Sequence, residues 1–292
     1  MSLKHKILSL SYHPLKISSH LTRRFSNSPI PRLRVLLYHD IMPIDEEAFS
    51  MQLSWLSSRW KFLDPKEFSE IISNETKLKE DSVLLTFDDG FSSNRRLAER
   101  VLMPLDIKAI FFIVSKFASL DNKEKTREFI AKNFFPEKLL SDIPNHLSNM
   151  DWNDLEYLLS QGHHIGGHTA NHLRLSELPE SELYDEIVSS ADILEERLGV
   201  NLEHFAYSFG NLESFSPAAL EIAKKRFKYI YTGLRGDNAN NVPLWAIRRD
   251  AMQSKDHHVD NHSSIGALLE GIADRNYTKP LYKYHQWGDK ST

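Results

Sequence analysis

Short apolar runs alternate with helical segments along most of this chain. Between the runs, apolar residues recur at the three- and four-residue spacing of amphipathic helices, as in Leu183, Ile187 and Leu194. Strands that alternate with helices form parallel sheets. About seven such units predict a single α/β barrel rather than an open doubly wound sheet, because the chain shows no glycine-rich phosphate-binding turn. The expected strands are 34–39, 83–87, 109–114, 164–168, 204–207, 229–232 and 245–249.

The chain is expected to consist of a basic arm, residues 1–31, and one domain, residues 32–292. Ser, His and Pro interrupt every apolar run of the arm, and no small-residue cleavage site follows, so it does not resemble a signal peptide. We expect a loosely ordered, solvated tail, with weak contact to an anionic membrane surface as the alternative. No repeat or linker divides the remaining residues.

Composition excludes several classes of protein. The 41% hydrophobic and 26% charged fractions are those of a soluble globular protein, and no apolar run has the length of a transmembrane helix. A net charge of −4 argues against nucleic acid as a partner. With no Cys and 14 His, any transition-metal site must use His and carboxylate ligands, a set typical of hydrolytic centres open to water.

Two polar segments directly follow expected strands, and in a barrel the ends of parallel strands converge on one face. The first is Thr86-Phe87-Asp88-Asp89-Gly90, and the second is His168-Thr169-Ala170-Asn171-His172, preceded by two glycines. Each alone has an ordinary alternative, a turn for Asp-Gly and surface imidazoles for the histidines. Together, two His four residues apart and one Asp would supply three metal ligands.

The two segments together resemble the polysaccharide deacetylase family, also called carbohydrate esterase family four or the NodB-homology domain. Val35-Leu36-Leu37-Tyr38-His39-Asp40 is similar to the opening strand of the branch that contains biofilm-glycan deacetylases. Residues 152–162 lead into the second segment much as they do in family members. The resemblance covers about residues 34–250.

This resemblance implies a distorted (β/α) barrel that binds a divalent ion, most often Zn²⁺, with Co²⁺, Ni²⁺ or Mn²⁺ as alternatives. Asp89, His168 and His172 would be the metal ligands, and Asp88 the general base that takes a proton from the attacking water. Which of the two adjacent carboxylates faces the metal stays open at this point.

A third segment, residues 204–210, is similar to the family's R-x-P-Y/F-G motif, which implies substrate contacts for Tyr207 and Phe209. Ala206 stands where an arginine often orients the catalytic Asp, and Ser208 replaces the proline. We predict that Arg249 takes the place of the missing arginine and so belongs to the catalytic set. Arg249 is favoured over Arg248 because it shares the strand parity of the apolar Ile247, although a surface arginine pair is the alternative.

The family's late Leu-x-His motif, which supplies the general acid, is not visible. His257, His258 and His262 lie in that part of the chain, and His262 is only a weak suggestion for the role.

The resulting hypothesis is a metal-dependent hydrolase that removes the N-acetyl group from a sugar of a polysaccharide, an oligosaccharide or a lipid-linked glycan precursor. A deformylase of a formamido sugar and a catalytically impaired carbohydrate-binding relative are the alternatives. A cytoplasmic location is expected because no export signal is recognised. The oligomeric state is left open.

Overall fold

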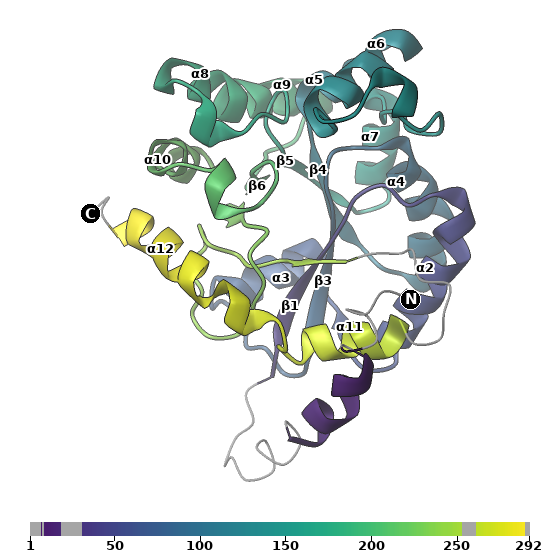
Figure 1. The fold of residues 1–292 in the computed structure, drawn as a ribbon, viewed down its shortest axis with the longest axis vertical. Helices are drawn as coiled ribbons and strands as arrows, with labels where there is room; N and C mark the ends of the chain where they lie inside the picture. The colour runs from purple at the N-terminus through teal and green to yellow at the C-terminus, as the bar shows by residue number, and fades with distance from the viewer. Residues whose placement is uncertain (1–6, 8, 19–30, 253–260, 290–292) are drawn as a thin grey trace.

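The computed structural model describes residues 7, 9–18, 31–252 and 261–289. Its parallel strands form one curled sheet with the helices arranged around it, which confirms the distorted (β/α) barrel (Figure 1). Seven strands follow the order β7-β6-β5-β4-β3-β1-β8, and an eighth, β2, pairs with β3. The strands are β1 (Leu33–Tyr38), β2 (Lys61–Phe62), β3 (Ser82–Phe87), β4 (Ala109–Ile113), β5 (His164–Gly167), β6 (His204–Ala206), β7 (Tyr229–Tyr231) and β8 (Asp250–Ala251).

Most expected helices form where the periodicity places them. Local caps explain several starts: Asp64 accepts the backbone N–H of Glu67 ahead of Pro65, and Ser216 caps the helix that begins at Pro217 in the same way. The helices are α2 (Glu46–Ser57), α3 (Pro65–Ile72), α4 (Ser92–Leu97), α5 (Ser115–Ala118), α6 (Lys123–Phe129), α7 (Trp152–Ser160), α8 (Glu180–Tyr184), α9 (Ser190–Leu198), α10 (Pro217–Arg226), α11 (Asn261–Leu269) and α12 (Thr278–Asp289).

The strands β1, β3 and β4 are buried along their whole length, so the sheet has apolar residues on both faces. Val35, Leu84 and Ile110 belong to a cluster with Ile247, whereas Leu36 and Leu85 pack in a second cluster with the helices. Because alternate residues fill opposite sides of each strand, polar side chains are accommodated mainly where the strands end.

The last strand differs from the prediction. Instead of a strand over 245–249, Trp245 lies in a turn, Ile247 forms a single parallel bridge with Tyr231, and β8 pairs with β1. This segment therefore contacts both β7 and β1, the two strands at the ends of the remaining sheet. It closes the barrel by dividing its pairing between them, and Arg249 lies between the two pairing points.

The terminal regions also depart from expectation. Within the segment expected to be a loosely ordered arm, residues 9–18 are helical, and Tyr12 is buried with its ring edge-on to Trp55. At the other end, α12 follows the last expected strand, after α11. Among the described residues, no helix is both long enough and apolar enough to cross a membrane.

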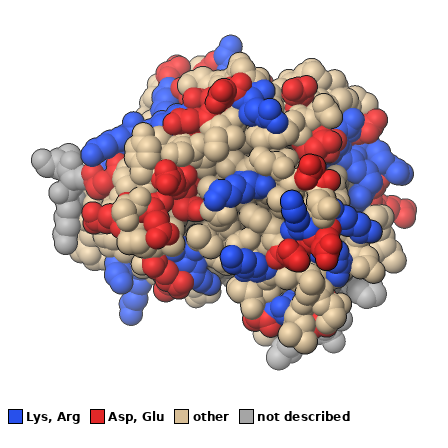
Figure 2. All heavy atoms as spheres, turned by 90° about the horizontal axis from the view of Figure 1, so that it is seen from above, with Lys and Arg blue, Asp and Glu red and all other residues tan. Residues whose placement is uncertain are grey.

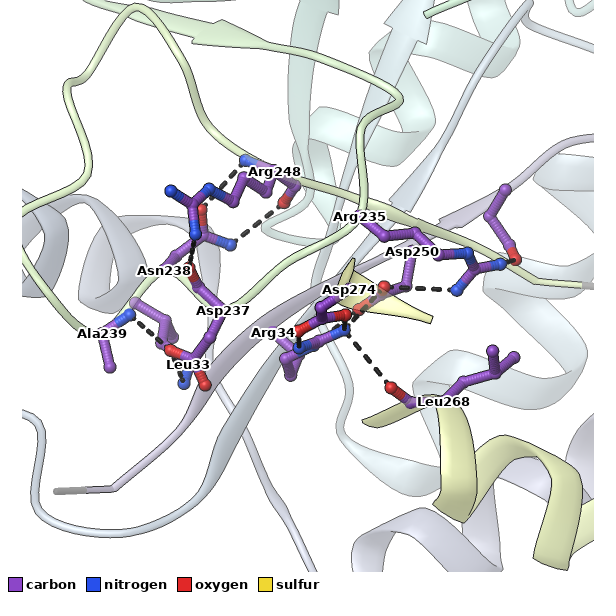
Figure 3. A network of polar contacts seen from close by, with 11 residues as sticks. Leu33, Arg34, Arg235, Asp237, Asn238, Ala239, Arg248, Asp250, Leu268 and Asp274 are labelled. Carbon is purple, nitrogen blue, oxygen red and sulfur yellow. Dashed lines mark hydrogen bonds and ion pairs between the residues drawn. The ribbon is translucent and has the colours of Figure 1, made fainter. Parts of the chain in front are cut away.

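A buried network of charges fastens β8 to β1 (Figure 3). Arg34 of β1 pairs with Asp250 through Nε–Oδ2 and Nη2–Oδ1 contacts of 2.7 and 2.8 Å. Its Nη1 lies 2.8 Å from Oδ2 of Asp274, and Arg235 approaches Asp250 from the other side at 3.2 Å. Since Arg34 and Asp250 are both almost inaccessible to water, each charge depends on its partners.

The substitution Asp250→Asn is expected to lower the free energy of unfolding by about 3 kcal/mol, because it removes a charge partner from the buried guanidinium of Arg34. Urea denaturation measures the change. Glu99→Gln is the control, since the exposed Arg95–Glu99 pair should contribute less than about 1 kcal/mol. Equal effects of the two substitutions would contradict the assigned role of the network.

Candidate metal and substrate site

The two polar segments meet at the carboxyl ends of β3 and β5. Oδ1 of Asp89 lies 3.5 Å from Nε2 of His168 and 3.4 Å from Nε2 of His172. All three side chains are buried, and their potential ligand atoms lie within 4.8 Å of one another. Of the two adjacent carboxylates, it is Asp89 that contacts both imidazoles.

Backbone carbonyls orient both imidazole rings. Nδ1 of His168 lies 2.6 Å from the carbonyl oxygen of Ala206, and Nδ1 of His172 lies 3.2 Å from that of Asn133. Because a carbonyl only accepts, each Nδ1 is the protonated nitrogen, and each ring, when neutral, directs an Nε2 lone pair towards Asp89. Oδ1 of Asp89 is buried and has no hydrogen-bond partner. A buried oxygen without a donor, facing two such nitrogens, fits a divalent cation.

The buried charges shift the pKa values of all three side chains. Burial alone would raise the pKa of Asp89, but the neighbouring imidazoles of His168 and His172 outweigh it and lower the pKa. Burial lowers the pKa of His172 to about 4, so this ring is neutral near pH 7. For His168, burial acts to lower the pKa, whereas Asp88 and Asp89 raise it and prevail.

The backbone of the group is strained. Asp89, Thr169 and His172 have φ angles of 75°, 68° and 59°, in the left-handed region that residues with a side chain seldom adopt. Oγ1 of Thr169 accepts the backbone N–H of His172 at 2.9 Å, which holds the turn closed. Strain of this kind persists where surrounding contacts enforce it, commonly at functional sites.

Glu186 enforces the same turn from a neighbouring helix, and the sequence analysis missed it. Its side chain is buried, and Oε2 accepts the backbone N–H groups of Ala170 and Asn171 at 3.2 and 3.0 Å. The side chain of Asn171 donates to the other carboxylate oxygen. Glu186 belongs to η7 (Asp185–Ser189), a π-helical turn between α8 and α9. Periodicity assumes a regular helix and gives no signal for such a turn.

Asp88 pairs with Arg249, and its Oδ2 also lies 3.8 Å from Nε2 of His168. Nη1 and Nη2 of Arg249 lie 2.7 and 2.9 Å from Oδ1 and Oδ2 of Asp88, and both side chains are buried. Nε of Arg249 donates to the carbonyl oxygen of Thr232 at 2.9 Å, so the guanidinium is held at both ends. Arg248 points elsewhere and donates to the carbonyl oxygen of Asp237 (Figure 3). The structure thus brings an arginine to Asp88 although Ala206 cannot supply one.

A cavity of about 530 Å³ opens onto these residues. Phe209 lies on its wall, with its ring 4.6 Å from that of His172 and with 37% of its surface exposed. His39 and Asp40 contribute polar groups from the end of β1, and Nε2 of His146 lies 3.1 Å from Oδ2 of Asp40. Apolar side chains make up much of the remaining wall: Leu37, Met42, Phe91, Phe134, Phe135, Pro144 and Leu147.

Two predicted site residues do not reach the cavity. Tyr207 is completely buried, stacks on Phe215 and donates its hydroxyl to the carbonyl oxygen of Gly210 at 3.3 Å. The expected substrate contact of Tyr207 is therefore wrong, because its ring belongs to the core under the Phe209 turn. His262 stacks on Trp55 and is not among the cavity residues, so it is not placed to act as the general acid. His257 and His258 lie outside the described residues.

The surface seen from above in Figure 2 carries Lys and Arg side chains interspersed with Asp and Glu. This mixture differs from the continuous basic patch that a nucleic-acid-binding protein presents. On this face, neither sign of charge forms a continuous patch.

The chain is similar to known proteins in sequence and in fold. The chain is 24% identical over 247 residues to a protein of Bacillus subtilis (strain 168) named "Putative polysaccharide deacetylase YxkH". The match covers 82% of this chain and 77% of the relative. Among solved structures, IcaB from Ammonifex degensii has a TM-score of 0.65 at 23% identity, over 82% of this chain and 98% of that one. The Streptococcus pyogenes deacetylase PplD, solved in complex with acetate, has a TM-score of 0.60 at 20% identity, over 77% and 93%.

At these identities the solved structures establish the shared fold. The family follows from the model described as "Polysaccharide deacetylase", which matches residues 75–227. This range is just over half of the chain and includes Asp88, Asp89, His168 and His172. The chain belongs to the polysaccharide deacetylase family.

Proposed function

We propose that this protein is a metal-dependent carbohydrate N-deacetylase. Its substrate would be an N-acetylated sugar of a polysaccharide, an oligosaccharide or a lipid-linked glycan precursor, and its products acetate and a free amine. The observation that carries the proposal is the unpartnered, buried Oδ1 of Asp89 facing Nε2 of His168 and His172, beside a second carboxylate on Asp88. Family membership supports the class of substrate.

Asp89, His168 and His172 would hold the ion, with Zn²⁺ favoured by the mixed nitrogen and oxygen ligands and Co²⁺, Ni²⁺ or Mn²⁺ as alternatives. A divalent ion in such a site supplies Lewis-acid polarisation of a carbonyl and acidification of water. Three protein ligands leave coordination positions available on the cavity side.

Asp88 would act as the general base. Arg249 engages both of its oxygens, which fixes the plane of the carboxylate while leaving further lone pairs to accept a proton from water. The water oxygen then bonds to the acetyl carbon, and the carbon–nitrogen bond breaks. Holding the base in one orientation reduces the entropic cost of that step.

The departing nitrogen needs a proton donor, and the cavity offers two histidines for this role. His39, just after β1, lines the same cavity as Asp89, and so does His146, whose Nε2 contacts Asp40. Either would replace His262 in the proposed mechanism. Separate His39→Gln and His146→Gln variants distinguish them, because loss of the donor should lower kcat more than it raises KM.

Purified protein should release acetate from N-acetylhexosamine oligomers, lose this activity in a metal chelator and regain it when a divalent ion is added. Asp88→Asn should lower kcat by about 10²–10⁴-fold while metal content stays unchanged. Acetate quantification and elemental analysis measure the two effects.

Three other outcomes would redirect the assignment. Formate released from a formamido sugar would favour a deformylase, and glycan binding without hydrolysis under any divalent ion would favour a catalytically impaired relative. Activity that is unaffected by the chelator would contradict the proposed metal dependence.

Arg249→Lys should lower kcat by about 10²-fold without changing metal content, because an ammonium cannot hold both oxygens of Asp88. Arg248→Lys is the matched control, since the neighbouring arginine contacts the 237–238 turn instead. Steady-state kinetics of the two variants decide the point. Unchanged kinetics in Arg249→Lys would contradict the proposed positioning role of Arg249.

Glu186→Gln should weaken metal binding by about 10–100-fold, because an amide keeps one accepting oxygen, whereas both carboxylate oxygens accept N–H groups of residues 170 and 171. Chelator competition measures the metal dissociation constant, and thermal unfolding without metal reports folding. Glu182→Gln, on the exposed side of α8, is the control. Metal affinity equal to that of the unsubstituted protein would show that Glu186 does not position the turn.

A further inference from the structure

The N-terminal helix, residues 9–18 with residue 7 also helical, exposes an apolar stripe to solvent. Ile7, Leu10 and Ile17 have exposed fractions of 57%, 79% and 61%, and Pro14 between them is also exposed. Their spacings of three, four and three residues place them on one face of the helix. Large apolar side chains gathered in this way on a surface helix mark an interaction site.

The opposite face of the helix is attached to the domain. Tyr12 lies about half a turn around the helix from the stripe and has an exposed fraction of only 8%. The ring of Tyr12 packs edge-on against Trp55 of α2. It also lies against Gly266 of α11, where a Cβ would approach the ring carbon Cε2 to 2.3 Å. The stripe therefore faces solvent, and the helix that carries it lies beside α11 (Figure 1).

The charge of the surrounding sequence selects the kind of partner. Residues 1–39 contain no Asp or Glu, whereas the first 31 include five Lys or Arg. Two copies of this chain meeting through the stripe would bring these cations together with no carboxylate from either segment to offset them. An anionic lipid surface offers both an apolar layer for the stripe and opposite charge for the cations. The basic residues are Lys4, Lys6, Lys16, Arg23 and Arg24.

We propose that the N-terminal helix docks this protein onto the surface of an anionic lipid bilayer, with Ile7, Leu10 and Ile17 inserted among the lipids. The stripe lies near the beginning of β1, and the cavity lies at the ends of the strands. A docked molecule thus leaves the cavity uncovered by the lipid surface. This inference concerns location and does not depend on the proposed reaction.

Vesicle flotation of the full chain tests the proposal, with phosphatidylcholine vesicles that contain or lack phosphatidylglycerol. We expect binding only to the anionic vesicles and a decrease with added salt. Leu10→Ser and Ile17→Ser should each lower the partition coefficient by about tenfold or more, because each removes an apolar side chain from the lipid layer. Tyr282→Ser is the control: Tyr282 is 67% exposed on α12, and its loss should leave binding unchanged.

Folding of each variant is verified by thermal unfolding, so that loss of binding is not confused with loss of structure. Absence of binding to anionic vesicles, equal binding to neutral ones or an equal loss in Tyr282→Ser would overturn the proposal. So would a dimer in analytical ultracentrifugation that Leu10→Ser dissociates, because it would assign the stripe to a second copy. Failure of the deacetylase assay would leave this result unaffected.

Discussion

The architecture of the site depends on one buried ion pair, between Asp88 at the end of β3 and Arg249 in the segment that closes the barrel. Burying either charge alone would be costly, and only two-point contact with a well-placed partner offsets the loss of hydration. The closing segment is fixed on both sides, by the bridge of Ile247 to β7 and by β8 beside β1. The Arg34–Asp250 pair strengthens the second attachment. The segment that closes the barrel therefore also orients Asp88.

The same constraint separates the two adjacent carboxylates. The left-handed backbone of Asp89 turns its side chain towards His168 and His172, while Asp88 is held by the guanidinium. Two identical groups thus acquire different surroundings: one lacks any hydrogen-bond partner for a buried oxygen, and the other is tightly bound by an arginine. This difference supports assigning one to a metal and the other to proton transfer.

How far sequence could predict these features depended on how local each signal is. The pattern of β3 and the cap of α3 lie within a few residues, and β3 formed as expected. The last strand was misplaced because its pairing is divided between partners distant in sequence. Tyr207 was misassigned because a motif position does not reveal whether an aromatic ring faces the cavity or the core. Glu186 was missed because a π-helical turn changes the direction of a side chain without changing the apolar pattern.

By itself, the sequence determined the alternation of strands and helices, the restriction of any metal site to His and carboxylate ligands, and the two segments that contribute them. These properties follow from residue type and short-range spacing. Tertiary structure decided between Asp88 and Asp89 as the contact of both histidines and between Arg248 and Arg249 as the partner of Asp88. It alone showed that Tyr12 attaches a helix whose apolar stripe faces solvent. Each of these depends on contacts between residues 43 or more positions apart, which only the closed barrel and its packed helices bring together.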